Sequence, residues 1–371
     1  MIRICAIVSL LTTVAHGLLR FPCSQLVTQR FDPLVTPGQV SPHVHQIVGG
    51  NAFNLTMDPD LDLPNLATCT TCRFKEDKSN YWTAVMYFKH PNGSFIRASF
   101  LLSHLEQYLK SSGFRMVVGN PMLRSDKAFP PNSSEAYALT FRCWETEDLL
   151  GYSNLGAPGT GAYDTINLPN RPCPAGIRAN IFFPSCWDGV NLDSPDHRSH
   201  VAFLEGPIRP EGGLFFREGT CPYTHPVRIP LLFYEVYWDT RPFNSLWPED
   251  DSQPFVLSMG DPTGYGHHGD YVFGWEGDSL QRAMDICTDV RGRPTDCTEL
   301  TVLSDDEINS CTQEPQVDEI VEGQYLPELP GCNPIQHGPA PAIPIDNCDA
   351  VSTTGFGSAT RALRTLATAR P

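Results

Sequence analysis

Prolines and glycines restrict the fold of this chain more than any other feature, because 34 prolines and 29 glycines occur among its 371 residues. Proline removes an amide donor and glycine adds backbone freedom, so both interrupt helices. Between them lie short runs rich in β-branched and aromatic residues, the pattern of strands bounded by turns. These runs are residues 81–88, 114–118, 136–142, 177–183, 231–238 and 255–258. The pattern predicts a mainly β fold, a sandwich or barrel-like single domain with long disulfide-tied loops and few short helices.

Two segments have helical patterns. Asp278 and Gln281 are placed as an N-cap and a capping-box partner, and a 3–4 spaced apolar stripe follows them up to Cys287. A second helix is expected over residues 100–111, where the apolar spacing is less regular.

The two ends of the chain differ in composition from its middle. Residues 1–17 read as a secretory signal peptide, with Arg3 before an apolar stretch and small residues at the exit. We expect a β-rich domain over residues 18–290, an irregular, acidic, disulfide-tied extension over 291–348, and a disordered tail over 349–371. The apolar stretch is too short to span a membrane, and no later stretch is longer. We therefore expect a secreted, extracellular protein with no membrane partner.

Cysteine and sequon counts agree with export. Removing Cys5 with the signal leaves twelve of the thirteen cysteines, an even number that allows up to six disulfides. Cys69-x-x-Cys72 has no second closely spaced pair, so disulfides are favoured there over zinc or redox chemistry. Glycosylation sequons at Asn54, Asn92 and Asn132 indicate a eukaryotic glycoprotein with these side chains on its surface.

Charge narrows the class of partner. The formal net charge is −16, and the sequence has no cluster of lysines or arginines that could follow a phosphate backbone. Nucleic acid is therefore excluded as the expected partner. Most of the carboxylates are interpreted as a solvated acidic surface.

Six of the eleven histidines lie in three motifs. The first is Ser-Pro-His43-Val-His45-Gln, in which residues i and i+2 of a strand point to the same face. Neutral imidazoles at this spacing can bind a divalent metal ion or act as acid and base near neutral pH. The structural alternative is a pair of histidines that hydrogen-bond to backbone carbonyls.

The second motif, Asp193-Ser-Pro-Asp196-His197-Arg-Ser-His200, holds four side chains within eight residues that could bind a metal ion or act as acid or base. A short helical turn would put His197 and His200 on one face, whereas an extended segment would not. The structural alternative is a solvated loop with an Asx turn at Asp193.

The third motif is Gly266-His267-His268-Gly269-Asp270, at the end of a glycine-rich segment. The glycines let the backbone approach a ligand closely, although they suit tight turns equally well. Asp270 could accept a hydrogen bond from an imidazole and so fix its tautomer. Glu235, in the middle of an aromatic strand, is a further candidate acid, unless it lies on the solvent face.

The chain resembles the DUF1996 family of secreted, mostly fungal proteins. The matching stretches include Pro-His-Val-His45, Cys186-Trp-Asp-Gly through His200, Cys221-Pro-Tyr-Thr-His-Pro, and Gly260-Asp-Pro-Thr-Gly-Tyr-Gly-His-His-Gly-Asp270. The resemblance extends from about residue 30 to residue 290. It implies export and the extent of the domain, but no reaction.

The leading hypothesis is a secreted carbohydrate-active enzyme, a hydrolase or lyase acting on polysaccharide or cell-wall glycan. One divalent metal ion is a candidate cofactor. The competing hypothesis is a non-catalytic cell-wall or carbohydrate-binding protein. The predicted catalytic set is His43, His45, His197, His200, His268, Asp196 and Asp270, with His43, His45, His200 and His268 as candidate metal ligands.

Overall fold

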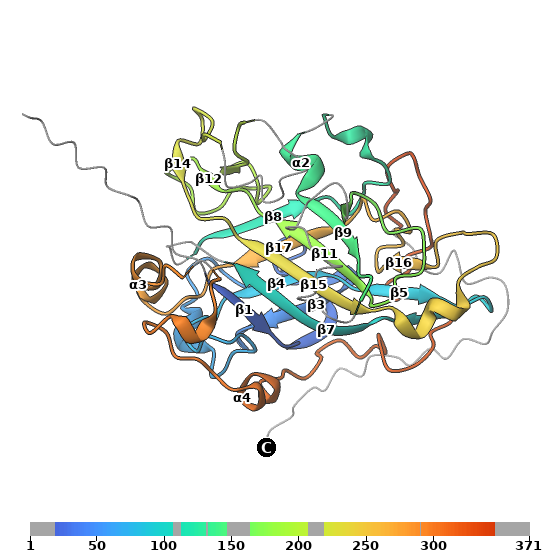
Figure 1. Cartoon of the computed structure of the whole chain (residues 1–371), viewed down its shortest axis with the longest axis horizontal. Coiled ribbons are helices and arrows are strands. Elements are labelled where there is room, and N and C mark those ends of the chain that lie inside the picture. The colour runs from blue at the N-terminus through green and yellow to red at the C-terminus, as the bar shows by residue number, and fades with distance from the viewer. Residues whose placement is uncertain are drawn as a thin grey trace, which may run out of the picture.

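Two antiparallel sheets form most of the molecule (Figure 1). The structure is a computed structural model and describes residues 19–106, 113–130, 133–146, 164–206, 219–289 and 291–345. The six-stranded sheet has, in spatial order, β1 (Arg20–Cys23), β7 (Ser99–Glu106), β15 (Phe233–Asp239), β11 (Ile177–Phe182), β9 (Leu139–Cys143) and β10 (Asp164–Thr165). The five-stranded sheet has β2 (Val27–Phe31), β3 (Val40–Gly49), β4 (Asn80–Ala84), β17 (His268–Val272) and β8 (Arg115–Gly119).

Smaller elements surround these sheets. Two three-stranded sheets are formed by β13 (Val201–Ala202), β12 (Cys186–Trp187) and β14 (Val227–Arg228), and by β16 (Phe255–Leu257), β5 (Met86–Lys89) and β6 (Phe95–Arg97). The helices are α1 (Leu63–Leu66), α2 (Ser134–Tyr137), α3 (Ser279–Ile286) and α4 (Asp305–Ser310), with 3-10 turns at Asp126–Ala128, Arg241–Leu246 and Pro294–Asp296. The mainly β prediction is confirmed, and the described strands form no closed barrel.

The main hydrophobic core lies between the two large sheets. Tyr81 of β4 and Tyr234 of β15 have ring centroids 6.1 Å apart. The indole of Trp238 in β15 donates to the side-chain oxygen of Gln46 in β3 at 3.1 Å, which is a second link between the two sheets. Strands of both sheets supply fully buried side chains to this core, so the fold is a sandwich.

The other face of the five-stranded sheet carries a second core. Ile47, Trp82, Val117 and Val272 pack there with residues of the loops that follow β2 and β3. The segment after α3 returns to this region, since Gln313 donates its backbone N–H to the Leu26 carbonyl at 3.1 Å. Because loops cover this face, polar side chains on it are shielded from water.

One element prediction is wrong, and a second is correct for only part of its segment. Residues 99–106 form β7 instead of a helix, because both edges of this segment pair with strands, β1 on one side and β15 on the other. Residues 107–111 of the expected helix lie outside the described residues. In the segment 136–142, the strand begins only at Leu139. The preceding turn, α2, is capped by the Ser133 hydroxyl, which accepts from the Ala136 N–H.

The helix expected near residue 280 is present as α3, but its predicted capping box is not formed. Asp278 occupies the N-cap position without a side-chain cap, and the Gln281 amide donates to Asp285 instead. Asp278 forms an ion pair with Arg282 one turn later. The complete capping box belongs to α4, where Ser304 and Glu307 bond to each other's backbone N–H groups.

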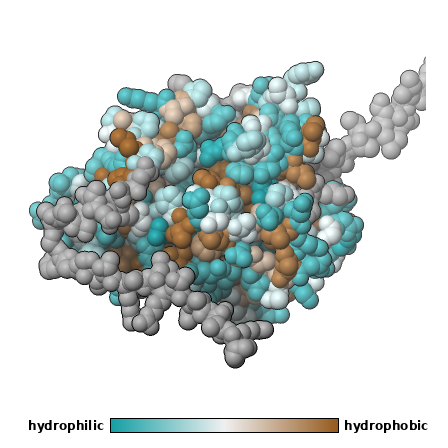
Figure 2. Space-filling view, turned by 180° about the vertical axis from the view of Figure 1, so that it is seen from behind, coloured by the Kyte–Doolittle hydropathy of each residue, from teal (hydrophilic) through white to brown (hydrophobic). Residues whose placement is uncertain are grey.

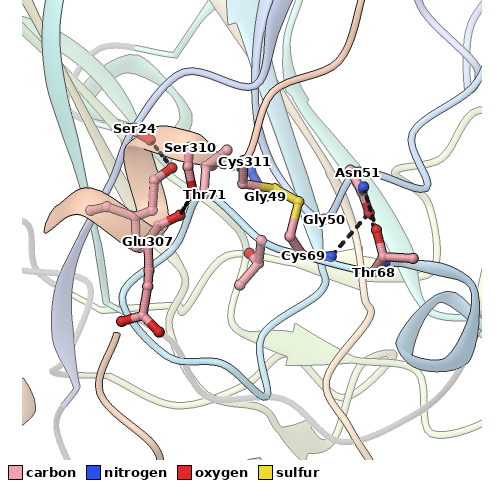
Figure 3. The surroundings of a disulfide bond; sticks show 12 residues. Ser24, Gly49, Gly50, Asn51, Thr68, Cys69, Thr71, Glu307, Ser310 and Cys311 are labelled. Atoms are coloured by element: carbon pink, nitrogen blue, oxygen red, sulfur yellow. Dashed lines mark hydrogen bonds between the residues drawn. A yellow bond between two sulfur atoms is a disulfide. The ribbon is translucent and has the colours of Figure 1, made fainter. Parts of the chain in front are cut away.

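Disulfides tie distant segments together. The bonds are Cys23–Cys72, Cys69–Cys311, Cys143–Cys173, Cys186–Cys221 and Cys287–Cys297, and Cys332 is also disulfide-bonded. The Cys69-x-x-Cys72 pair therefore splits between two bonds, as a structural role predicts. Figure 3 shows Cys69 joined to Cys311 beside α4, with Ser24 nearby. The Ser24 hydroxyl donates to the backbone carbonyl of Ile308 in α4.

The surface is mixed in character. In the view from behind, hydrophobic residues are scattered among hydrophilic ones (Figure 2). Asn54 and Asn92 of the sequons are exposed. In the described part of the chain, no helix is long and apolar enough to cross a membrane. The signal peptide predicted over residues 1–17, Asn132 and the tail predicted over residues 349–371 lie outside the described residues.

The buried carboxyl group of Asp77 is expected to make the stability of the fold depend on pH. Its carboxylate accepts hydrogen bonds from the Ser79 N–H and the Tyr81 hydroxyl, and burial raises its pKa to about 7. Between about pH 4 and 7 the folded chain therefore retains a proton that the unfolded chain loses, so stability falls as pH rises, by at most about 1.4 kcal/mol per pH unit. We expect Asp77→Asn to remove this slope. Urea unfolding of both proteins from pH 4 to 8 measures it, and equal slopes would contradict the assignment.

Candidate metal centre

Three histidines from two strands meet on the outer face of the five-stranded sheet. His43 and His45 lie on β3 and point to the same face, as their spacing predicts. His268 begins β17, which is separated from β3 by β4. His45 pairs directly with Ala84, the last residue of β4. The register of β3 and β17 on β4 places Ala84 between His45 and His268 in the sheet.

The three imidazoles converge through their Nε2 atoms. Nε2 of His268 lies 3.1 Å from Nε2 of His43 and 3.3 Å from Nε2 of His45. The opposite nitrogen of His268, Nδ1, donates to the Gly266 carbonyl at 3.1 Å. In the neutral ring, Nε2 of His268 therefore carries a lone pair. A single lone pair cannot satisfy two N–H donors well, so hydrogen bonding alone accounts poorly for this cluster.

The spacing of these atoms suits a metal ion. Zinc binds histidine nitrogens at about 2.0–2.1 Å in a tetrahedral arrangement, which places neighbouring ligands roughly 3.3 Å apart. The candidate ligand atoms of the three residues all lie within 4.8 Å of one another. The Gly266 carbonyl orients His268 in the way that outer-shell acceptors orient metal-binding histidines. Three nitrogen ligands leave a fourth position for water or substrate.

The pKa values of the three histidines favour their neutral form. Burial, together with the neighbouring rings, holds the pKa of His43 and of His45 well below its usual value. Burial also lowers the pKa of His268 to about 4. All three rings are therefore neutral near pH 7, which is the form that binds metal.

The cluster is buried. His43, His45 and His268 are 7%, 0% and 3% exposed, and none of them lines the hollow of about 780 Å³ beside β8. Two of the three ligands lie within β3, an inner strand of the sheet that loops cover, which explains this burial. The hollow begins one strand away, where Val117 and Gly119 of β8 line it.

Gly119 fits closely against the third ligand. It pairs with His268 and has a φ of +83°. A Cβ atom at this position would lie 2.7 Å from the His268 Cα and 2.3 Å from the His267 carbonyl oxygen. Only glycine allows β8 to pass so near this histidine.

Asp270 lies two residues after His268 on β17, but it does not orient an imidazole as predicted. Both of its carboxylate oxygens are buried and have no hydrogen-bond partner among the described residues. Burial, and then the charge of Asp32, raises the pKa of Asp270 well above its usual value, against the attraction of Arg198. Asp32 is also buried and accepts from the backbone N–H groups of Leu34 and Val35.

His197 lies apart from the cluster. It donates from Nδ1 to Asp193 at 2.6 Å and from Nε2 to the Leu34 carbonyl at 3.0 Å. The bond to Asp193 raises the pKa of His197. Both ring nitrogens are engaged by acceptors, so neither is free to bind a metal ion. The backbone at His197 has a φ of +55°, which fits neither of the two geometries considered for this motif, a helical turn or an extended strand.

His200 and Asp196 also support the loop around His197. Nε2 of His200 donates to the Arg115 carbonyl at 2.8 Å, so this nitrogen is not free for a metal ion. Asp196 accepts from the Ser199 N–H at 2.9 Å and from the Ser194 hydroxyl at 2.8 Å. The structure does not bring His197, His200 or Asp196 to the three-histidine cluster, and these side chains shape the loop instead.

Two other candidates have structural partners. Glu235 is buried and forms an ion pair of 2.7 Å with Arg178, so it does not face solvent. His267, next to His268, points into the main core, where its ring lies against Phe141 and Trp238. Burial lowers the pKa of His267 to about 3.

Residues 32–275 match the sequence profile of a domain of unknown function, DUF1996. The chain belongs to the DUF1996 family. This stretch includes β3, β4, β8 and β17, so all three histidines of the cluster lie within the DUF1996 domain. No curated protein and no solved structure matches the chain.

Sequence reasoning missed three contributors to this site, namely Ala84, the Gly266 carbonyl and Arg198. Ala84 is a small residue in a run of otherwise large ones, Tyr81-Trp-Thr-Ala-Val-Met-Tyr-Phe, which is a usable signal. The role of a backbone carbonyl has no such signal. Arg198 lies inside the second histidine motif, of which the sequence prediction included only Asp196, His197 and His200.

Proposed function

We propose that this protein is a secreted, metal-dependent enzyme that cleaves a polysaccharide, by hydrolysis or by elimination. The observation that carries the proposal is the convergence of three neutral imidazole nitrogens at the spacing of metal ligands. His43, His45 and His268 would hold the ion. Bound there, a divalent metal would acidify a water molecule or polarise a substrate oxygen.

The chain's own residues supply the other parts of the site. The Gly266 carbonyl fixes the ring of His268. Asp270, two residues further along β17, has two oxygens without a hydrogen-bond partner among the described residues, and we assign to it the role of holding a proton during cleavage. The hollow of about 780 Å³ beside β8 has the size of a ligand-binding site.

Export to the cell exterior is part of the proposal. Disulfides persist in oxidising compartments, and this fold has five between described cysteines. The exposed side chains of Asn54 and Asn92 are available for glycosylation. Glycans of the cell wall are abundant in the same environment.

The competing proposal is a non-catalytic glycan-binding protein in which the metal braces the sheet. The burial of all three imidazoles is the observation that favours it. A structural ion would tolerate burial, whereas a catalytic ion needs access for substrate.

Activity of a histidine variant separates the two proposals. We expect metal-loaded protein to release reducing ends or unsaturated products from at least one polysaccharide in a panel. His45→Ala should lower this rate at least a hundredfold, because the metal would lose a ligand. His90→Ala is the matched control, since His90 lies outside the cluster against Tyr325. Glycan binding that persists in both variants without any cleavage would favour the competing proposal.

A further inference from the structure

We propose that Arg198 binds a carboxylate of the substrate in the hollow that it lines, so that the recognised glycan is an acidic one built from uronic acids. The inference rests on the proposed function, because it names the substrate class for the same site. Arg198 is the only basic residue among the described residues that line this hollow.

In contrast to the other shielded arginines, Arg198 has no directly bonded partner among the described residues, and only the longer-range attraction of Asp270 and Asp196 acts on its guanidinium. Among described residues it makes neither a side-chain hydrogen bond nor an ion pair, although it is only partly exposed. Each fully buried arginine has an anionic or carbonyl partner: Arg97 with Glu322, Arg115 with the Met57 carbonyl, Arg124 with the Gln336 carbonyl, Arg142 with Asp164, and Arg178 with Glu235. Five donors in a shielded position favour a ligand with paired acceptors, and a carboxylate matches this geometry.

The backbone around Arg198 is fixed by hydrogen bonds, whereas its guanidinium makes no hydrogen bond to a described residue. Its N–H bonds to the Ser194 hydroxyl and to Asp196, both at 3.1 Å. His197 and His200 bond to the Leu34 and Arg115 carbonyls and so attach the loop to the sheet. The histidines of the second motif therefore hold the loop that carries Arg198 in a fixed position, rather than binding the metal ion.

The hollow offers the remaining features of a saccharide site and lies close to the metal ligands. Phe129 and Phe203 supply apolar rings and Asn120 a polar group, while the rim carries the exposed Glu135 and Glu205. One wall is Val117 to Gly119, which pairs with β17 from His268 to Asp270. A substrate carboxylate bound to Arg198 would lie deeper in the hollow than Glu135 and Glu205. These two glutamates would repel other carboxylates of the glycan at the rim, so the glycan would enter in one orientation.

Calorimetric binding of matched oligosaccharides tests the inference. The probes are hexamers of galacturonate, glucuronate and mannuronate, each compared with the same hexamer after methyl esterification, and a sulfated neutral hexamer. We expect at least one free acid to bind ten times more tightly than its ester. Arg198→Gln should weaken binding of that acid by about tenfold to a hundredfold and leave the ester unchanged. Arg198→Lys should give a smaller loss, because lysine keeps the charge but not the paired donors.

Lys89→Gln is the control, because it removes an equal charge from an exposed position outside the hollow. Equal affinity for acids and esters, selective binding of the sulfated probe alone, or an Arg198→Gln variant that binds the acid normally would each overturn the inference. Metal content and melting temperature of the variants confirm that they are folded. If the protein cleaves a neutral glycan, and the Arg198→Gln variant cleaves it at the same rate, this inference is rejected and the proposed function stands. If an acidic glycan binds in an Arg198-dependent way but no glycan is cleaved, this inference stands and the proposed function is rejected.

Discussion

Saturating zinc is expected to raise the melting temperature of the metal-free protein by roughly 8 °C. A ligand at a thousand times its dissociation constant stabilises the folded state by about 4 kcal/mol, and each kcal/mol shifts melting by roughly 2 °C in a domain of this size. The stabilisation arises because only the folded chain brings His43, His45 and His268 together. Differential scanning fluorimetry with and without zinc, after treatment with a chelator, measures the shift.

Single histidine variants localise the effect. His45→Ala should abolish the zinc-dependent shift, whatever it does to the melting temperature of the metal-free protein. His90→Ala, on the loop after β5, should retain the full shift. A shift of equal size in His45→Ala and in the unmodified protein would show that zinc binds elsewhere.

Removal of the Cys69–Cys311 disulfide is expected to lower the free energy of unfolding by about 5 kcal/mol. This bond closes a loop with a sequence separation of 242, so it restricts the unfolded chain more than any shorter bridge would. In the folded state it attaches α4 and the segment after it to the loop that follows β3 (Figure 3). Urea unfolding of the Cys69→Ser, Cys311→Ser double variant measures the loss.

The Cys287–Cys297 bridge is the matched control, because its sequence separation is only 10. We expect the Cys287→Ser, Cys297→Ser variant to lose about 3 kcal/mol. Equal losses in the two variants would contradict the role of loop length. In the Cys69–Cys311 variant alone, amide exchange should increase near Gln313, whose backbone bonds to Leu26.

Local patterns predicted the parts of the site that depend on a single strand. The spacing of His43 and His45 indicated a shared face, and β3 presents both rings as expected. The arrival of His268 depends on the order of strands in the sheet, with β4 between β3 and β17. His43 and His268 are 225 residues apart in sequence, and no local pattern encodes that strand order.

The second histidine motif was harder to interpret for a different reason. Both geometries considered for it, a helical turn and an extended strand, assume regular backbone, whereas His197 adopts a positive φ. That conformation is stabilised by bonds to Asp193 and to the distant Leu34 carbonyl. Residues 99–106 show the same limit, because their strand conformation depends on pairing with β1 and β15.

The presence of a metal ion between the three imidazoles is tested most directly by anomalous diffraction from crystals grown with zinc. Data collected just above the zinc absorption edge should show one strong peak about 2 Å from Nε2 of His43, His45 and His268. Well-ordered rings with no peak between them, in crystals saturated with zinc, would contradict the account. The cluster would then be a set of buried, hydrogen-bonded histidines.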